Sequence, residues 1–226
     1  MEIARLVKRA IIKSPFRPSH SIEMLLNLLK LGKWLKENQN GTHLESRNDL
    51  YRYVHTLLGN SPIHYLEFGV FEGESMRFWS GVNTHAQSRF YGFDTFTGLP
   101  DRWHVFGSSF DPGHFDADGR RPEISDQRVT FVKGLFQDTL DDFLEKYEVP
   151  SQLIVHCDAD LHASTLYVLT RMHHYMIPGT VLIFDDFSVA NHDFKAFLDY
   201  VSSYRRKYDV IATAEIAWEK IALRML

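Results

Sequence analysis

His64-Tyr-Leu-Glu-Phe-Gly-Val-Phe-Glu-Gly73 is the stretch that decides the fold of this chain. Its first residues are mostly apolar, as in a buried β-strand, and Gly69 and Gly73 bracket a sharp turn into a helix that begins near Glu74. A ligand can approach the backbone at such a turn. An ordinary tight turn between a strand and a helix explains the same residues, so this stretch alone leaves both interpretations open.

The residues of this turn argue against a dinucleotide. Folds that bind nicotinamide or flavin dinucleotides usually carry G-x-G-x-x-G, which is missing here. The acids Glu67 and Glu72 would repel a pyrophosphate, but they could hold an ammonium group. A cationic ligand without phosphate therefore suits the turn better. S-adenosylmethionine is such a ligand, and the turn predicts it as the cofactor.

Strand-like and helix-like segments alternate after this stretch. We expect strands at 89–94, 128–133, 153–158 and 180–185, helices at 163–176 and 194–207, and a hairpin from 208–213 and 220–226. This alternation predicts a Rossmann-like α/β fold with a mostly parallel, seven-stranded sheet and helices on both faces. The ligand is then expected at the carboxyl ends of the strands.

About sixty residues before the first strand are predicted to be mainly helical. They comprise an amphipathic, basic helix at 2–13, a second helix that ends near residue 37, and a third from Ser46 to Leu58 with Asp49 in a capping box. We therefore divide the chain into an N-terminal helical extension, residues 1–61, and a cofactor-binding domain, residues 62–226. The basic helix either makes peripheral contact with an anionic membrane or packs on its own domain or on a second subunit of a homodimer.

The composition narrows the class of protein. The 226 residues are 44% hydrophobic and 24% charged, as expected for one domain with a substantial core. The net charge of −4 argues against nucleic acid as the main partner, although residues 1–36 carry eight Lys or Arg against two Glu. The single cysteine, Cys157, excludes an intrachain disulfide and a cysteine-rich zinc site. With no secretory-signal pattern and no predicted membrane span, we expect a cytoplasmic location.

One long connection, residues 95–127, is rich in Gly, Pro, Asp and aromatic residues. A connection of this length in a compact domain is usually a lid or a binding loop, and we name it the lid. Its rings either cover a substrate or close the loop on itself. They belong to Trp103, His104, Phe106, Phe110, His114 and Phe115.

Carboxylates stand at the ends of the expected strands. Asp94 can accept the hydroxyls of an adenosine ribose, or it can cap the turn that follows. Asp158, Asp160, Asp185 and Asp186 should converge on one rim, where they repel one another unless a cation neutralises them. A hard divalent ion such as Mg²⁺ takes oxygen ligands. Helix capping by Asp160 and Asp186 is the alternative, but it leaves Asp158 and Asp185 unexplained.

Five ordered motifs, spread over about residues 62–210, carry a family resemblance. They are Leu66–Gly73, Tyr91–Pro100, Phe131–Leu140, His156–Thr165 and Phe184–Phe187. Together they resemble the class I S-adenosylmethionine-dependent methyltransferases of the macrocin O-methyltransferase type, which methylate sugars. The resemblance implies methyl transfer to a hydroxyl of a sugar or glycoconjugate, in a natural product or a surface polysaccharide. A small-molecule or glycan acceptor would then be the partner.

The resemblance also implies roles for individual residues. Around the cofactor's methionine part it places Glu67, Gly69, Gly73 and Ser75, with Asp158 nearby, while Asp94 holds the ribose and the turn with Gly134, Phe136 and Asp138 lies by the adenine. The implied metal ligands are Asp158, Asp185 and Asp186. His162 stands where family members commonly have Tyr.

The acceptor's proton requires a base. Asp158 or Asp160 is the candidate by position, and His104, His114 and His162 are alternatives because a histidine pKa suits neutral pH. Two other functions compete with methyl transfer. Asp158-Ala-Asp160 also matches the D-x-D pattern by which glycosyltransferases hold a metal and a nucleotide sugar. The second competing function is that of a methyltransferase-like binding subunit without catalytic activity.

Overall fold

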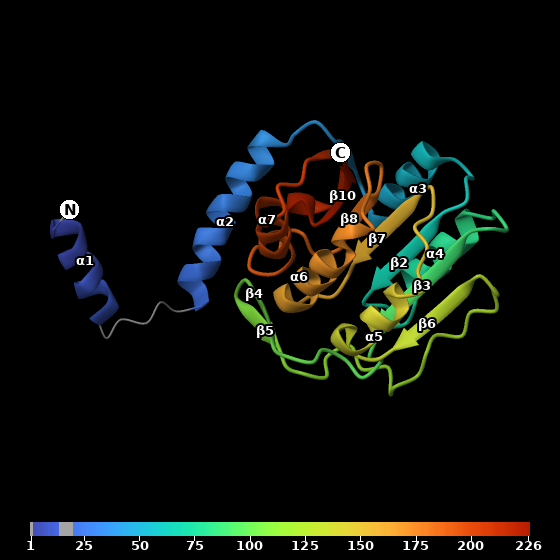
Figure 1. The fold of residues 1–226 in the computed structure, drawn as a ribbon, viewed down its shortest axis with the longest axis horizontal. Coiled ribbons are helices and arrows are strands. Elements are labelled where there is room, and N and C mark those ends of the chain that lie inside the picture. Colours follow the sequence, from blue (N-terminus) through green and yellow to red (C-terminus); the bar gives the residue numbers. More distant parts are fainter. Residues whose placement is uncertain (1, 14–19) are drawn as a thin grey trace.

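The computed structural model describes residues 2–13 and 20–226, and its centre is an eight-stranded sheet in the order β1-β9-β10-β8-β7-β2-β3-β6 (Figure 1). The strands are β1 Thr42–Leu44, β2 His64–Phe68, β3 Arg89–Asp94, β6 Val129–Lys133, β7 Leu153–Cys157, β8 Val181–Phe184, β9 Tyr208–Ala214 and β10 Lys220–Met225. All pairs are parallel except those of β10 with β8 and β9. The predicted α/β fold is confirmed, and β1 adds an edge strand that the sequence did not predict.

Helices cover both faces of this sheet. They are α2 His20–Glu37, α3 Arg47–Leu58, α4 Glu74–Val82, α5 Phe136–Leu144, α6 His162–Arg171 and α7 Asp193–Ser203, with 3₁₀ turns at Met172–His174 and Ile216–Trp218. The first helix, α1 Glu2–Lys13, does not lie on the sheet (Figure 1). Leu66 and Phe68 of β2 pack in one core cluster with α2, α5, α6 and α7, whereas Tyr65 packs in another with α3 and α4. The alternation of side chains along a strand therefore supplies both layers.

The N-terminal region is built into this core. Trp34 of α2 contacts the rings of Phe194 and Phe197 on α7, and Figure 1 shows the two helices running beside each other. Ser46 caps α3 by accepting a hydrogen bond from the backbone N–H of Asp49, as predicted. The region assigned to a helical extension, residues 1–61, also contains the strand β1, which pairs with β9. Among the described residues, no helix is long and apolar enough to cross a bilayer.

The lid contains a small hairpin that was expected only as loop. Its strands are β4, Trp103–Val105, and β5, Ser108–Phe110, which pair antiparallel. Trp103 stacks on Phe110 with ring centroids 5.2 Å apart, and Phe115 contacts Phe71 at 5.5 Å. The aromatic residues of the lid thus close the hairpin on itself and also attach the lid to the turn after β2.

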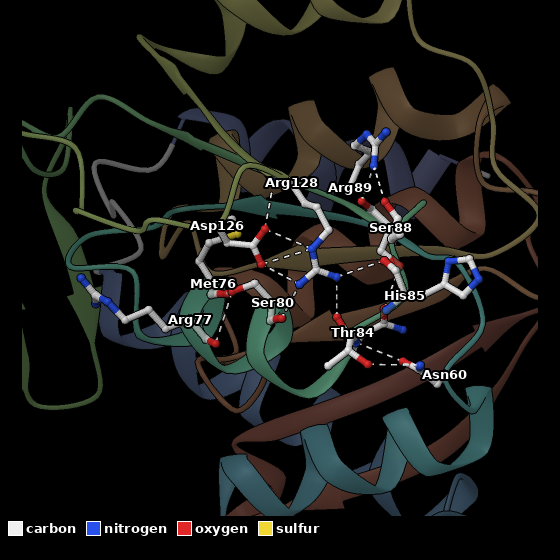
Figure 2. A network of polar contacts seen from close by, with 12 residues as sticks. Asn60, Met76, Arg77, Ser80, Thr84, His85, Ser88, Arg89, Asp126 and Arg128 are labelled. Carbon is white, nitrogen blue, oxygen red and sulfur yellow. Dashed lines mark hydrogen bonds and ion pairs between the residues drawn. The ribbon is translucent and has the colours of Figure 1, made fainter.

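Arg128, just before β6, secures the C-terminal end of α4 (Figure 2). Its guanidinium donates to the carbonyl oxygens of Ser80 at 2.7 Å, Asn83 at 2.7 Å and His85 at 3.0 Å, and it pairs with Asp126 at 2.6 Å. The last carbonyls of a helix have no partner inside the helix. Arg128 supplies a partner for one of these carbonyls, that of Ser80, and for the carbonyls of Asn83 and His85 just beyond the helix. It thereby joins the end of α4 to the start of β6, the strand beside β3.

The sheet reverses its direction of growth at β2. From β2 the chain adds β3 and then β6 on one side, and it returns to β7 and β8 on the other side. A topological switch point of this kind opens a crevice at the carboxyl ends of the flanking strands. Gly69 follows β2 and Asp158 follows β7, so the predicted ligand turn and the first predicted metal ligand meet at this crevice.

Candidate active site

A cavity of about 320 Å³ occupies the crevice at the carboxyl ends of the parallel strands. Its wall contains the ends of β2, β3, β7 and β8, the start of α5, and part of the lid. The lining residues are Arg47, Gly69, Val70, Phe71, Asp94, Thr95, Gly98, Leu99, Pro100, Trp103, Phe115, Leu135, Phe136, Gln137, Asp158, Ala159, Asp160, Ser164, Asp185 and Asp186. The lid therefore forms one wall of the cavity that it was expected to cover.

Gly69 is required by the geometry of the turn. Its φ is +96°, and a Cβ built there would lie 1.7 Å from the backbone oxygen of Asp158. Any side chain would therefore push β2 and β7 apart exactly where the cavity begins. Gly73, with φ +77°, is the N-cap residue of α4 and does not line the cavity; a Cβ there would meet Pro122 of the lid at 2.9 Å. Of the two predicted glycines, only Gly69 reaches the cavity.

Asp94 lines the cavity and also builds the turn beside it. One carboxylate oxygen accepts hydrogen bonds from the backbone N–H groups of Val70 at 2.7 Å and Phe71 at 2.8 Å, and the other accepts from Phe96 at 2.7 Å. Phe71 and Phe96 both have left-handed backbone angles, with φ of +48° and +58°. The carboxylate thus holds two strained turns in place. The predicted role of Asp94 as a turn cap is therefore present, and the ribose contact stays a prediction for a carboxylate that lines the cavity.

Glu67 is buried and is not among the residues that line the cavity. It is 1% exposed, and one of its oxygens lies 3.4 Å from Nδ1 of His156, which is completely buried in β7. Nδ1 of His156 also contacts the Tyr65 hydroxyl at 2.6 Å. Burial by itself lowers the pKa of His156, but its hydrogen bonds to Asp185 and Glu67 outweigh burial and raise the pKa to about 9. A protonated His156 therefore bridges two buried carboxylates.

Asp185 has several cationic neighbours of its own. It is 3% exposed, and its carboxylate lies 3.3 Å from Arg47, 3.5 Å from Lys220 and 3.4 Å from His156. Burial raises the pKa of Asp185, but the hydrogen bond and charge of His156 and the charges of Lys220 and Arg47 lower it well below its usual range. The protein thus supplies positive charge that the sequence argument had assigned to a metal alone. Arg47 and Lys220 were not predicted as partners of Asp185, because they belong to α3 and β10, which are distant from Asp185 in the sequence.

The other three acids have less positive charge near them than Asp185 has. Burial, together with the neighbouring carboxylates, raises the pKa of Asp158 well above its usual range and that of Asp160 to about 9. For Asp186, burial raises the pKa to about 6 even though Lys220 opposes the shift. These acids favour either a proton or a bound cation. The predicted convergence of Asp158, Asp160, Asp185 and Asp186 on one cavity is therefore present.

Oxygen ligands for a divalent cation are close together at this site. Ligand atoms of His156, Asp158 and Asp185 all lie within 4.8 Å of one another. Both ring nitrogens of His156 already have partners, namely Tyr65 and Glu67 on one side and Tyr51 and Asp185 on the other. Of the three predicted metal ligands, this group therefore contains Asp158 and Asp185 but not Asp186. Carboxylate oxygens such as those of Asp158 and Asp185 suit Mg²⁺.

The remaining cofactor-binding candidates fall at different distances from the cavity. Phe136 lines it at the start of α5, between Leu135 and Gln137. Asp138 is exposed in the first turn of α5, and Gly134 precedes that helix, but neither lines the cavity. Ser75 is buried in the first turn of α4, and its hydrogen bond lowers the pKa of Glu67 in part, although burial keeps that pKa raised.

None of the candidate histidine bases is among the described residues that line the cavity. The His162 ring lies 3.0 Å from both Asp199 and Lys195, which belong to α7. His114 packs against Phe110 and Phe115 within the lid, with ring centroids 4.5 and 4.3 Å apart. His104 belongs to β4 of the lid. The acids Asp158 and Asp160 are thus the candidate bases that the structure brings to the cavity.

Ser164, Leu99 and Pro100 also line the cavity, although the sequence analysis assigned them no role. Ser164 lies in α6, two residues after His162. Both residues belong to the same motif, and the sequence analysis assigned a role only to the histidine. Leu99 and Pro100 lie in a lid whose path could not be traced from residue types. Their position depends on the turns at Phe96 and Gly98, where the backbone has left-handed angles.

Comparisons with known proteins agree with this geometry. Residues 66–187, more than half of the chain, match the family described as "Methyltransferase domain". The calicheamicin methyltransferase CalS11 superposes with a TM-score of 0.58 at 19% identity, over 99% of this chain and 91% of that one. No curated protein sequence matches significantly.

Two further solved structures share the fold. The O-methyltransferase NovP has a TM-score of 0.54 at 18% identity, over 90% of this chain and 98% of its own. A structure of CmcI described with Mg and SAM has a TM-score of 0.54 at 19% identity, over 80% and 72%. At these identities the likeness shows the fold, while the family match reaches the strand ends that build the cavity. The chain therefore belongs to this family of methyltransferase domains and is an S-adenosylmethionine-dependent methyltransferase.

Proposed function

We propose that this enzyme transfers a methyl group to a hydroxyl of a sugar or glycoconjugate, as an O-methyltransferase of the macrocin type. The observation that carries the proposal is one cavity lined by two kinds of groups from neighbouring strand ends. Gly69 and Asp94, at the ends of β2 and β3, suit the cofactor, and Asp158 and Asp186, after β7 and β8, suit a polyhydroxyl acceptor. CalS11, which shares the fold, is described as a TDP-rhamnose 3′-O-methyltransferase.

On the cofactor side, each residue has a role that its position supports. The close backbone approach at Gly69 suits the methionine part, and Asp94 can accept a ribose hydroxyl at the one lone-pair site of about four that its three backbone hydrogen bonds leave free. The apolar side chains of Leu135 and Phe136 suit a flat adenine ring. Glu67 and Ser75 are buried, and their hydrogen bond joins the end of β2 to the first turn of α4.

We further propose that Asp158, Asp185 and Asp186 hold a divalent cation, Mg²⁺ or a similar ion, next to the acceptor. Carboxylates that are desolvated and close together favour such an ion. Asp185 already pairs with Arg47 and Lys220, so Asp158 and Asp186 offer the cation more negative charge that no side chain neutralises. The ion would supply charge that orients the acceptor hydroxyls and makes them more acidic.

The chain's own residues complete the transfer. The acceptor oxygen forms a bond to the methyl carbon, the carbon–sulfur bond breaks, and its electron pair stays on the sulfur. The hydroxyl proton passes to a carboxylate, for which Asp158 and Asp160 are the candidates in the cavity. Trp103 and Phe115 of the lid exclude water from this step.

A direct test measures methyl transfer to a panel of nucleotide sugars by mass spectrometry, with and without a chelator. We expect transfer that EDTA abolishes reversibly, and that Asp158→Asn or Asp186→Asn abolishes while affinity for S-adenosylhomocysteine changes by no more than about fivefold. Asp142→Asn, an exposed acid on α5, is the matched control and should retain activity. Transfer that persists in EDTA and in Asp185→Asn would make these acids structural.

The glycosyltransferase alternative makes a different prediction. A nucleotide diphosphate needs cationic side chains near Asp158-Ala-Asp160. Among the described lining residues, Arg47 is the one with a cationic side chain, and it already pairs with Glu74 at 2.6 Å and Asp185 at 3.3 Å. The cavity therefore favours methyl transfer. Calorimetry with S-adenosylhomocysteine alone separates the two functions, because a methyltransferase should bind this ligand and a glycosyltransferase should not.

A further inference from the structure

The first helix, α1, has separate apolar and basic faces. Ile3, Val7 and Ile11 follow one another at intervals of four residues, so they lie on one face, and they are 79%, 53% and 69% exposed. The other face carries exposed basic side chains, which are Arg5, Lys8, Arg9 and Lys13. A helix with this division of side chains suits the boundary between lipid headgroups and acyl chains.

A second apolar surface lies on α2, the next helix along the chain. Its inner face packs into the core through residues such as Leu31 and Trp34. Its outer face exposes four large aliphatic side chains, 40–65% accessible: Ile22, Leu25, Leu26 and Leu29. Contiguous exposed aliphatic residues on a folded domain mark a surface that meets another partner. Exposed lysines continue the same helix at Lys30, Lys33 and Lys36.

We propose that α1 and the outer face of α2 dock the enzyme on an anionic lipid bilayer. The charge distribution selects this partner, because residues 1–36 carry a net charge of +6 whereas the remainder of the chain carries −10. An anionic surface attracts the first region and repels the second. The electrostatic field therefore orients the molecule, and the apolar faces of the two helices enter the interface. Basic charge and aliphatic side chains together supply the two contributions that stable surface binding requires.

Two other occupants fit the charges less well. A second copy paired through α1 would bring two helices of like charge, each with four basic residues, next to each other. The chain's own domain does not cover α1, since Ile3, Val7 and Ile11 remain more than half exposed. The aliphatic residues of the outer face of α2 are likewise uncovered by α1.

Neighbouring isoleucines on α1 provide a matched pair of variants. Ile11 and Ile12 are each 69% exposed, but Ile11 continues the apolar row of Ile3 and Val7. Ile12 follows Lys8 by four residues, within the basic face. Both substitutions remove the same kind of side chain from the same helix, which contributes none of the described residues that line the active-site cavity. Only the first should weaken docking if the apolar face enters a bilayer.

The test uses the full chain and sedimentation with vesicles of phosphatidylcholine alone or mixed with phosphatidylglycerol. We expect sedimentation with the anionic vesicles, much less with neutral ones, and release when NaCl rises from about 50 to about 500 mM. Ile11→Asn should lower the partition coefficient about tenfold and Ile12→Asn less than about twofold, because only the first buries its side chain in lipid. Leu29→Asn on α2 should act like Ile11→Asn.

Three results would overturn the proposal. The first is equal partitioning of Ile11→Asn and Ile12→Asn, or sedimentation that ignores vesicle charge. The second is a change of molar mass in light scattering for Ile11→Asn with no vesicle binding by wild type, which would assign the face to a second copy. The third is a lower melting temperature of Ile11→Asn, again without vesicle binding, which would assign it to the chain's own domain.

Discussion

Replacing Asp94 by Ala should weaken both the fold and cofactor binding. The carboxylate accepts backbone hydrogen bonds from Val70, Phe71 and Phe96 in the structure, and two of these residues have left-handed backbone angles. Alanine leaves these N–H groups without their acceptor. The turn after β2 forms part of the cavity wall, so its distortion should reach the cofactor even where no ribose contact is lost.

The size of the effect follows from these contacts. A hydrogen bond to a charged group contributes about 1.5–3 kcal/mol, and water from the cavity can replace part of each bond that is lost. We therefore expect Asp94→Ala to lower the free energy of unfolding by about 3 kcal/mol, which corresponds to a melting temperature about 6–12 °C lower in a domain of this size. Affinity for S-adenosylhomocysteine should fall by at least about tenfold, or about 1.4 kcal/mol.

Calorimetry and thermal melting separate the two roles of Asp94. Both are measured on wild type, Asp94→Ala and Asp94→Asn, with S-adenosylhomocysteine and with an analogue that lacks the ribose hydroxyls. The loss of affinity in Asp94→Ala should be larger for the natural ligand, because only that ligand can contact the carboxylate through its hydroxyls. Asp94→Asn keeps one acceptor oxygen but places an amide N–H₂ opposite a backbone N–H, so intermediate stability is expected.

The reasoning fails in two distinguishable ways. An unchanged melting temperature in Asp94→Ala would show that the three backbone hydrogen bonds do not hold the turn. Equal losses of affinity for the natural ligand and the analogue would remove the ribose contact and leave Asp94 with the turn alone. Unchanged affinity for both ligands would remove it from the cofactor site altogether.

Other predictions follow from the contacts around the cavity and behind it. Arg128→Ala should lower the free energy of unfolding in urea by about 2–3 kcal/mol, and Arg128→Lys should restore less than half because one ammonium cannot reach the same carbonyls. Gly69→Ala should lower the free energy of unfolding far more than Gly59→Ala. Both glycines have positive φ, but only at Gly69 would a Cβ clash with the backbone oxygen of Asp158. Similar losses in the two variants would contradict that clash. Cleavage between Trp103 and Arg121 should slow when S-adenosylhomocysteine is added, and equal rates would rule out ordering of the lid.

Much of the fold could be predicted from sequence because it depends on local signals. Apolar strand runs, the cap at Ser46 and the sharp turn at Gly69 are all encoded by neighbouring residues. The convergence of Asp158 and Asp185 on one rim follows from the general geometry of parallel sheets. The strand β1 was missed because three residues, two of them exposed, carry no periodic pattern.

The charge balance of the site could not be predicted, because its partners are brought together by tertiary structure. Asp185 meets Arg47 from α3, Lys220 from β10 and His156 from β7. Each of those residues looks like an ordinary surface or core position in the sequence. The prediction that His162 serves as a base rested on its place in a motif, which does not give the direction of its side chain. In the structure its ring contacts Asp199 and Lys195 on α7.

The cations around Asp185 also show why the N-terminal region and the catalytic domain depend on each other. Arg47 stands at the first position of α3, which Ser46 caps and β1 precedes, so its location is fixed by pairing of β1 with β9. From there its guanidinium spans Glu74 on α4 and Asp185 after β8. Loss of Arg47 would remove one of the positive charges that compensate the buried carboxylate of Asp185, and this would lower the stability of the fold. The segment before the first predicted strand is therefore part of the active-site electrostatics, in addition to carrying the surface of α1 and α2.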